Sequence, residues 1–389
     1  MKSRLIFFYL LFVITSFNAC NGVSPKKVVI ADSLSTKADA RKTSLSTEDS
    51  KRIKHLNDIA NFIAGMPVDN QSELYAYTQT KEWINYSAEE KTAWDKFKTV
   101  SDQAATWRDK EVPKAKEPFQ TLFYPFGGPD YLYANIYFPN AKDYIMIGLE
   151  SPGSVPQFDA AAGKNLKKIL GLYKDAIADV IQLSFFRTVD MKVELTTNAI
   201  DGTAPIIMLF LARSGKQILD VKSMTLDAQG KLQYCDTKSK HCAVELKFCN
   251  PGDTAVRHIY YLSTNLADHA LTDNQPFFKF LEGIDGNSIS YIKSATYLMH
   301  KSYFSIIRNT VLNKSTLILQ DDSGIGYKFF DQTKWDITLY GTYEKPIDLF
   351  KEHFEPDLFE AFKKNAKPLN YRIGYSVKSA LLLAQKKQQ

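Results

Sequence analysis

The hydrophobic periodicity of this chain changes near residue 119, and that change most constrains its fold. Between residues 47 and 109 apolar residues recur at helical spacing, as Ile53, Leu56 and Ile59 do. From residue 120 to 150 the apolar runs are shorter and richer in aromatic residues, and turn residues separate them. Helical spacing followed by strand-like runs predicts an α+β fold, with mixed or antiparallel sheets and packed helices.

The same periodicity assigns individual elements. Strands are expected at 120–126, 132–138 and 144–150, then a helix at 160–186 and an antiparallel meander over 218–263. The run 204–212 is apolar throughout, so its period does not distinguish a helix from a buried strand. The last third predicts helices at 274–281, 289–312, 358–364 and 381–384, and strands at 315–320, 335–343 and 371–376.

The first twenty residues have the layout of a secretory signal peptide that ends at a cysteine. Lys2 and Arg4 precede an apolar run, 5–17, that is shorter than the about 20 residues needed to span a membrane. The segment resembles the lipobox of bacterial lipoproteins, although Phe17 stands where that family prefers Leu. The resemblance implies cleavage after residue 19 and a diacylglycerol anchor on Cys20. In that family an Asp directly after the cysteine retains the protein at the inner membrane, and here Asn21 takes that position. The resemblance therefore also implies an outer-membrane or cell-envelope location, periplasmic or surface-exposed.

Composition shifts divide the remaining chain. Residues 20–46 are rich in Ser, Thr, Lys and Ala and are expected to form a flexible tether. A helical segment is expected at 47–115, an α+β domain at 116–270, and a second α+β domain or a similar layer at 271–389.

Four cysteines are present, and two of them suggest a cross-link. Cys235 and Cys242 flank a turn-like stretch between two β-rich runs, so in an oxidising compartment a disulfide is expected to close this hairpin. Cys249 lies at an odd spacing from Cys242 and is expected on the opposite face as a buried thiol. The alternative, a metal site that includes His241, matches no zinc spacing, so no metal and no cofactor is expected.

Two carboxylates follow apolar runs in the first half of the chain. Gly127 and Gly128 form a special loop after Tyr124, and Asp130 lies at the exit of that loop, as a site residue or as a cap of the local backbone. Glu150 ends the next apolar run. It is expected either to act as a general acid or base or to pair with an arginine.

Further polar candidates lie later in the chain. Arg187 and Arg213 each stand at the rim of an apolar element, where a guanidinium favours a carboxylate or a phosphate. The loop that begins at Gln320 carries Asp321 and Asp322, which point to opposite faces if the chain is extended, and Tyr340 is a further binding candidate. We expect these segments, the Gly127–Asp130 loop and Glu150 to converge, either as a self-neutralising network or as a ligand site.

Composition and missing motifs narrow the function. The formal charge of +6 is too weak to predict a nucleic-acid partner, and the sequence contains no Walker loop, HExxH, GxSxG or CxxC motif. The body resembles uncharacterised exported bacterial proteins that pair a YPFGGPD-like loop with a QDDSG-like loop, a resemblance that implies no activity.

Two functions therefore stay open. The first is a lipid-anchored envelope protein of non-catalytic binding or assembly type, whose partners are the membrane, through the lipid, and an envelope glycan or protein. The alternative is a hydrolase or lyase that acts on envelope glycan through two of the carboxylates of Asp130, Glu150, Asp321 and Asp322.

Overall fold

The computed structural model describes most of the chain after residue 45. The described residues are 46–158, 163, 165–183, 196–197, 200–236, 242–375 and 378–387. They belong to one compact unit. The leader, Cys20, residues 20–45 of the tether, Arg187 and His241 lie outside the described residues, so the predictions made for them stay predictions.

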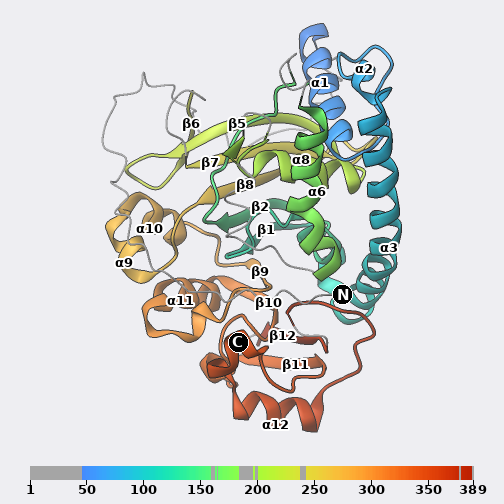
Figure 1. Cartoon of the computed structure of the whole chain (residues 1–389). Helices are drawn as coiled ribbons and strands as arrows, with labels where there is room; N and C mark the ends of the chain where they lie inside the picture. The colour runs from blue at the N-terminus through green and yellow to red at the C-terminus, as the bar shows by residue number, and fades with distance from the viewer. Residues whose placement is uncertain are drawn as a thin grey trace. The chain divides into compact units, whose positions relative to one another are not determined.

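A ten-stranded mixed sheet forms the centre of the fold (Figure 1). Its order is β11-β12-β10-β9-β1-β2-β8-β7-β5-β6, and the five strands from β10 to β8 are parallel. The parallel strands are β1 (Phe119–Tyr124), β2 (Ala141–Gly148), β8 (Arg257–Ser263), β9 (Ser288–Ile292) and β10 (Ser315–Asp321). The outer strands are antiparallel: β5 (Gln217–Leu226), β6 (Leu232–Tyr234), β7 (Ala243–Cys249), β11 (Trp335–Gly341) and β12 (Ala380–Lys386). A separate short pair joins β3 (Thr196–Thr197) to β4 (Ile200–Asp201).

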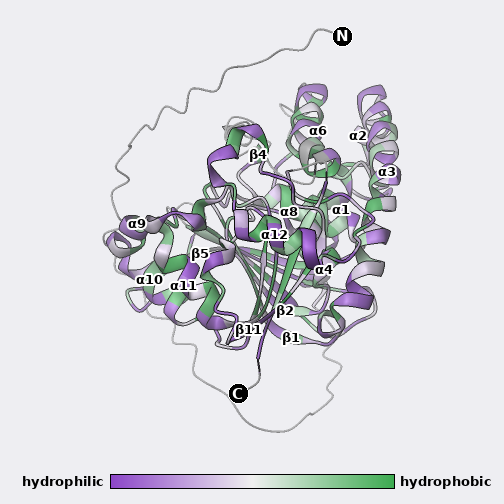
Figure 2. Cartoon of the chain, turned by 90° about the horizontal axis from the view of Figure 1, so that it is seen from below, coloured by the Kyte–Doolittle hydropathy of each residue, from purple (hydrophilic) through white to green (hydrophobic). Residues whose placement is uncertain are grey.

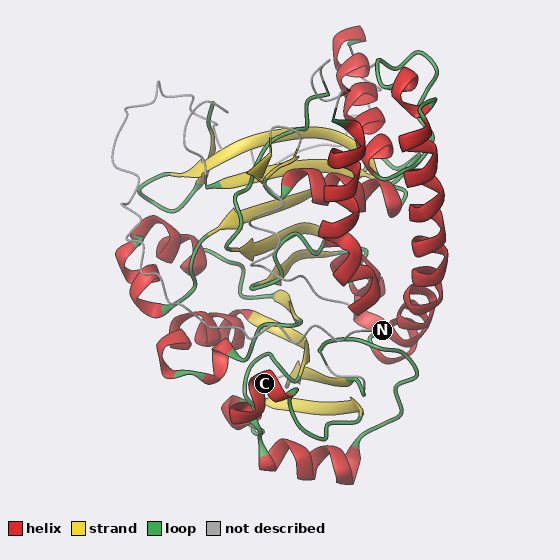
Figure 3. Ribbon diagram, in the orientation of Figure 1, coloured by secondary structure: helices red, strands yellow, loops and turns green. Residues whose placement is uncertain are grey.

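Helices cover both faces of the sheet (Figure 3). One face packs against α1 (Thr47–Ile63), α3 (Lys81–Glu111), α4 (Tyr131–Tyr137), α6 (Leu166–Leu183) and α8 (Ala204–Arg213). The other packs against α9 (Asp268–Asp273), α10 (Gln275–Glu282), α11 (Ser305–Lys314) and α12 (Pro356–Asn365). Shorter helices are α2 (Tyr75–Thr78) and the 3₁₀ turns η1 (Pro113–Lys116), η2 (Leu298–His300), η3 (Ser302–Phe304), η4 (Tyr327–Phe329) and η5 (Asp348–His353).

The alternation of side chains along each central strand produces two hydrophobic cores. In β1, Leu122 and Tyr124 belong to the core under α3, whereas Phe123 belongs to the core under α11. Hydrophobic residues accordingly gather in the strands between the two helical layers (Figure 2). The predicted α+β class, with a mixed sheet and packed helices, is therefore confirmed.

The two halves of the chain share this sheet. Strand β9, from the predicted second domain or layer, pairs directly with β1 from the first, and β10 pairs with β9. The helical segment at 47–115 packs into the same core as β1. In place of two similar layers, the structure has one sheet with a shared core on each face.

Three predicted elements have the wrong type. The stretch 132–138 is helix α4, because β1 and β2 are parallel and the chain must cross over between them, and Asp130 caps that helix. Residues 288–292 form β9 instead of the start of a helix, since two strands flank them. Residues 380–386 form β12, where pairing with β10 and β11 overrides the helix propensity of the Leu-rich run. The predicted strand at 371–376 is irregular in its described part, 371–375.

The ambiguous run 204–212 lies in helix α8, and the long helix expected at 160–186 is α6. In the described part of the chain, no helix combines the length and the apolar character needed to cross a membrane.

The predicted hairpin around Cys235 and Cys242 differs from the one observed. Strand β5 lies between β6 and β7, so the two cysteines flank β5 and do not lie on neighbouring strands. Their amides donate to Ser223 and Met224 of β5. Two strand spacings amount to about 9–10 Å, whereas a disulfide joins Cα atoms about 4.4–6.8 Å apart. The disulfide stays a prediction, and it requires β5 or the cysteines to shift. Cys249 is buried, as expected.

Candidate functional site

The candidate site lies where the path of the chain through the parallel strands reverses. The chain moves from β1 to β2 on one side, and later from β9 to β10 on the other. Strands β1 and β9 are hydrogen-bonded neighbours, so the loops that follow them diverge from one point. In open α/β sheets, ligands bind outside the carboxyl ends of the strands at such a switch point. We call this end of the parallel strands the carboxyl edge.

Backbone strain is concentrated at this edge. In the described part of the chain, the residues other than glycine with positive φ are Phe126 (63°), Ser294 (56°), Thr296 (51°) and Tyr297 (56°). Phe126 follows β1 and the other three follow β9, the two strands of the switch point. Each such residue costs about 1–3 kcal/mol and persists only where its surroundings enforce it. Strain of this kind clusters at functional sites.

A buried ion pair joins the loops after β1 and β9. The Nζ of Lys293 lies 2.9 Å from Oδ2 of Asp130, and both side chains are 2% exposed. Tyr124 donates a hydrogen bond to the same Oδ2 at 2.9 Å, and Asp130 Oδ1 accepts from the amide of Tyr133 at the start of α4. Burial raises the pKa of Asp130, and the charge of Lys293 opposes that shift. Asp130 is thus both a helix cap and one half of an ion pair.

Tyr291 and Asp321 complete this group, which we call the Lys293 cluster (Tyr124, Asp130, Tyr291, Lys293 and Asp321). The hydroxyl of Tyr291 is buried and has no hydrogen-bond partner among the described residues. Asp321 Oδ2 accepts from the amide of Ser294, and Oδ1 accepts from the amide and hydroxyl of Ser323. Asp321 therefore holds the strained loop after β9 in place, and burial raises its pKa.

A second group of titratable side chains lies beyond Asp321, and we call it the Asp322 cluster (Tyr297, His300, Asp322, His353 and Glu355). Tyr297 donates a hydrogen bond to Asp322 Oδ2, and its ring stacks on His353 at 5.2 Å between centroids. The Nε2 of His300 lies 3.9 Å from Oε1 of Glu355. Glu355 Oε2 accepts from the amide of Tyr327 at 2.7 Å.

Burial shifts the titration of the Asp322 cluster toward neutral forms. It raises the pKa of Asp322 to about 7, helped by the charge of neighbouring Asp321, while the hydrogen bond from Tyr297 opposes the shift. It also raises the pKa of Glu355 to about 7, opposed by the amide of Tyr327. Burial lowers the pKa of His300 to about 4. Perturbed groups of this kind mark candidate functional sites.

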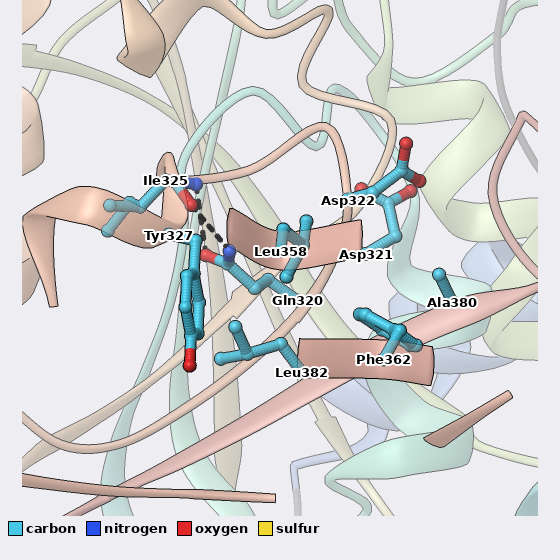
Figure 4. A pocket seen from close by; sticks show the side chains of 9 residues that line it. All are labelled: Gln320, Asp321, Asp322, Ile325, Tyr327, Leu358, Phe362, Ala380 and Leu382. Atoms are coloured by element: carbon cyan, nitrogen blue, oxygen red, sulfur yellow. Dashed lines mark hydrogen bonds between the residues drawn. The ribbon is translucent and has the colours of Figure 1, made fainter. Parts of the chain in front are cut away.

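A small pocket lies between the β10 loop and α12 (Figure 4). It has about 220 Å³ of empty volume, which includes open solvent. Asp321 and Asp322 lie together at one end, away from Tyr327, and Leu358, Phe362 and Leu382 supply apolar walls. Gln320 closes the loop, because its side-chain amide donates to the carbonyl of Ile325 and accepts from the amide of Ile325. Gln320 thus shapes the pocket through its own loop.

Glu150 lies at the carboxyl edge beside the Gly127–Asp130 loop. Its Oε2 accepts hydrogen bonds from the amide of Leu149 and from the hydroxyl of Tyr261. A Cβ on Gly148 would lie 2.6 Å from that oxygen and 2.9 Å from the Cα of Gly128. The carboxylate therefore requires a glycine at position 148. Glu150 does not pair with Arg213.

Two predicted binding residues lie elsewhere. Arg213 ends α8 just before β5, whose first residue, Gln217, pairs with Cys249 at the opposite edge of the sheet. Its guanidinium donates to the carbonyl of Ala64 and lies 5.1 Å from the ring centroid of Trp94. Tyr340 donates to Glu111 at 2.8 Å and packs against Trp107, so it joins β11 to α3.

The remaining segments meet at the carboxyl edge. These are the Gly127–Asp130 loop after β1, Glu150 after β2, and the Gln320–Asp322 segment at the end of β10. The partners of Asp321 and Asp322 differ, since Asp321 binds the Ser294 loop and Asp322 binds Tyr297.

Sequence reasoning missed Lys293, Tyr297, His300, His353 and Glu355. Lys293 follows the alternating run Ser288–Ile292, and this alternation could have identified a buried strand with a cation at its end. No local pattern marks Glu355 or the two histidines, because contacts between distant segments bring them to Asp322.

Among the described residues, no three side chains of His, Cys, Asp or Glu are grouped so that they could hold a metal ion. Comparison of the chain with protein-family models, curated proteins and solved structures finds no match.

Proposed function

We propose that this chain is an exported, lipid-anchored envelope protein that binds an envelope glycan, without catalysis, at the carboxyl edge of its sheet. The leader and Cys20 support the location, and the site at the switch point supports binding. Carboxylates accept hydrogen bonds from sugar hydroxyls, and Tyr327, Leu358 and Phe362 line the pocket beside Asp322 with aromatic and apolar surface.

The observation that carries the proposal is the strained backbone. Among the described residues, three of the four with positive φ other than glycine follow β9. In this loop Asp321 accepts from the amide of Ser294. Ser323 accepts from the amides of Ala295 and Tyr297. A loop that only connected β9 to the next helix would not need that conformation, so the strain favours a pre-organised ligand site.

Thr296→Gly tests this proposal in the full-length protein in detergent micelles, with soluble peptidoglycan fragments as the probe. Glycine relieves the strain at φ 51°, so the variant should be at least as stable as the wild type but bind the fragments less tightly. Gly171→Ala in α6 is the control, because a Cβ there meets no atom within 4 Å. Calorimetry that detects no binding to the wild type would overturn the proposal, as would unchanged affinity in Thr296→Gly.

The second candidate, a glycan hydrolase or lyase, is favoured by the two carboxyl groups of Asp322 and Glu355, each with a pKa of about 7. A carboxylic acid that keeps its proton at neutral pH can act as a general acid. Release of soluble fragments from insoluble peptidoglycan by the wild type, and its loss in Asp322→Asn, would establish this candidate over binding alone.

A further inference from the structure

The Asp322 cluster contains two acids, Asp322 and Glu355, that form no ion pair with a lysine or arginine among the described residues. The charge of Lys328 acts on Glu355 only from beyond ion-pair distance, and it opposes the rise in the Glu355 pKa. Lys293 is engaged with Asp130. Arg308 donates to the carbonyls of Met299 and Lys301 and lies over the ring of Phe329. Among the described residues, the one basic side chain within ion-pair distance of Glu355 is His300, which is neutral at physiological pH, and Asp322 has none. The site therefore offers acidic oxygens that a cation would complement.

Aromatic rings enclose the same group. The ring of Tyr297 lies 5.2 Å from that of Phe350 and 5.3 Å from that of His300, and Phe350 lies 5.3 Å from Tyr375. Because Tyr297 is 1% exposed, these rings pack behind the two acids and exclude water from them, which strengthens the attraction of the acids for a cation.

His300 supplies an independent indication of a ligand. Its side chain is 9% exposed, and its Nε2 has no hydrogen-bond partner among the described residues. The 3.9 Å from Nε2 to Glu355 Oε1 is too long for a hydrogen bond. A buried polar atom without a partner costs about 1–3 kcal/mol. A donor placed between these two atoms would satisfy both of them.

We propose that the Asp322 cluster binds a primary ammonium group of the ligand, with Asp322 and Glu355 as counter-charges and His300 Nε2 as an acceptor. This inference rests on the proposed binding function and names the chemistry of one part of the ligand. An amine-bearing glycan or glycopeptide fits it, whereas a fully acetylated one does not.

The proposal implies a change in proton content on binding. Near neutral pH the two carboxyl groups are partly protonated. A bound cation favours their ionised forms, so binding should release protons into the buffer.

The test compares peptidoglycan fragments that carry a free amine with the same fragments after N-acetylation, titrated into the full-length protein at pH 7. Acetylation should weaken binding at least about tenfold. The measured heat of binding of the free-amine fragments should differ between phosphate and HEPES buffers, because the released protons are taken up by buffers with different ionisation enthalpies. Equal affinity for both forms would overturn this inference and leave the proposed glycan binding intact.

Substitutions in the Asp322 cluster test whether this cluster is the site that prefers the free amine. Asp322→Asn and Glu355→Gln should each remove the preference for the free amine, and either one suffices if the other does not fold. Asp336→Asn is the control, because that side chain is 71% exposed on β11. If the variants keep the preference for the amine, the Asp322 cluster is not its site.

A simple amine separates this inference from the proposed function. Nα-acetyl-lysine amide carries an ammonium group and no sugar. If it binds while the fragments do not, the inference holds and the glycan proposal fails; if neither binds, both fail.

Discussion

Lys293, the first residue after β9, forms an ion pair with Asp130 in the loop after β1. This contact joins the two loops that diverge at the switch point of the sheet. The Nζ–Oδ2 distance is 2.9 Å, and both side chains are 2% exposed. Lys293 Nζ also lies 4.4 Å from the ring centroid of Tyr133. One ion pair thus connects the two halves of the chain and the start of α4.

The first prediction concerns this pair. Lys293→Met should lower the free energy of unfolding by about 3–5 kcal/mol, because it leaves the Asp130 carboxylate buried without a counter-charge. Adding Asp130→Asn should recover part of that loss, since Asn keeps a side-chain oxygen for the Tyr133 amide. Urea denaturation of the two single variants and the double variant measures the coupling. Strictly additive losses would contradict a direct pair.

Much of the carboxyl edge could be predicted from the sequence. The YPFGGPD segment, Glu150 and the Gln320–Asp322 segment each follow a strongly apolar run, and such runs form the buried parallel strands. A polar group that directly follows a buried strand lies at the edge of the sheet. The rule places these segments at one common edge only because β1, β2 and β10 run parallel, and that direction was not predicted.

Strand order and long-range partners could not be predicted. The alternation of Ser288–Ile292 marks a buried strand, but its pairing with β1 and β10, which brings Lys293 to Asp130, depends on segments far along the chain. Arg213 stands at the end of an apolar element, as expected, but at the end opposite to the site. Which end of a helix lies near the site depends on the direction in which the helix runs across the sheet, and the local sequence does not encode that direction.

A second prediction concerns the glycine that accommodates Glu150. Gly148→Ala should destabilise the protein, because the added Cβ would lie 2.6 Å from the Tyr261 hydroxyl and 2.9 Å from the Gly128 backbone. The cost of such overpacking is about 1–3 kcal/mol. Gly171→Ala in α6 should instead stabilise it by about 0.5–1 kcal/mol. Thermal unfolding of both variants checks the contrast, and equal stabilities would refute the close approach at Gly148.

A third prediction concerns the anchor. Cys20→Ser should move the protein from the membrane fraction to the soluble fraction of cells that express the full chain, because the hydroxyl cannot take the lipid that the lipobox implies. A wild-type protein already found in the soluble fraction after export would contradict the lipid anchor. Asn21→Ser is the matched control and should leave the protein with the membranes.

The last prediction concerns pH. Burial raises the pKa of Asp322 to about 7 from an ordinary value of 3.8. The folded state therefore binds this proton more tightly than the unfolded state. The stabilisation is fully present below the ordinary pKa and is lost as the pH rises toward 7. Glu355, whose pKa is also raised to about 7, changes stability in the same direction. His300 has the opposite effect, because its lowered pKa of about 4 makes stability fall as the pH drops below 6.5.

Asp322→Asn isolates one of these contributions. The amide cannot ionise and keeps an oxygen to accept from Tyr297, so the variant should lose less stability than the wild type between pH 5 and pH 8. The advantage of the variant over the wild type should grow by about 2–3 kcal/mol from pH 5 to pH 8, because only the wild-type carboxyl group ionises in the folded state over that range. Denaturant unfolding at the two pH values measures it, with Asp336→Asn, on an exposed side chain, as the control. Parallel pH profiles for wild type and Asp322→Asn would show that Asp322 ionises as an ordinary carboxyl group. The ammonium site would then have no bound proton to exchange at Asp322.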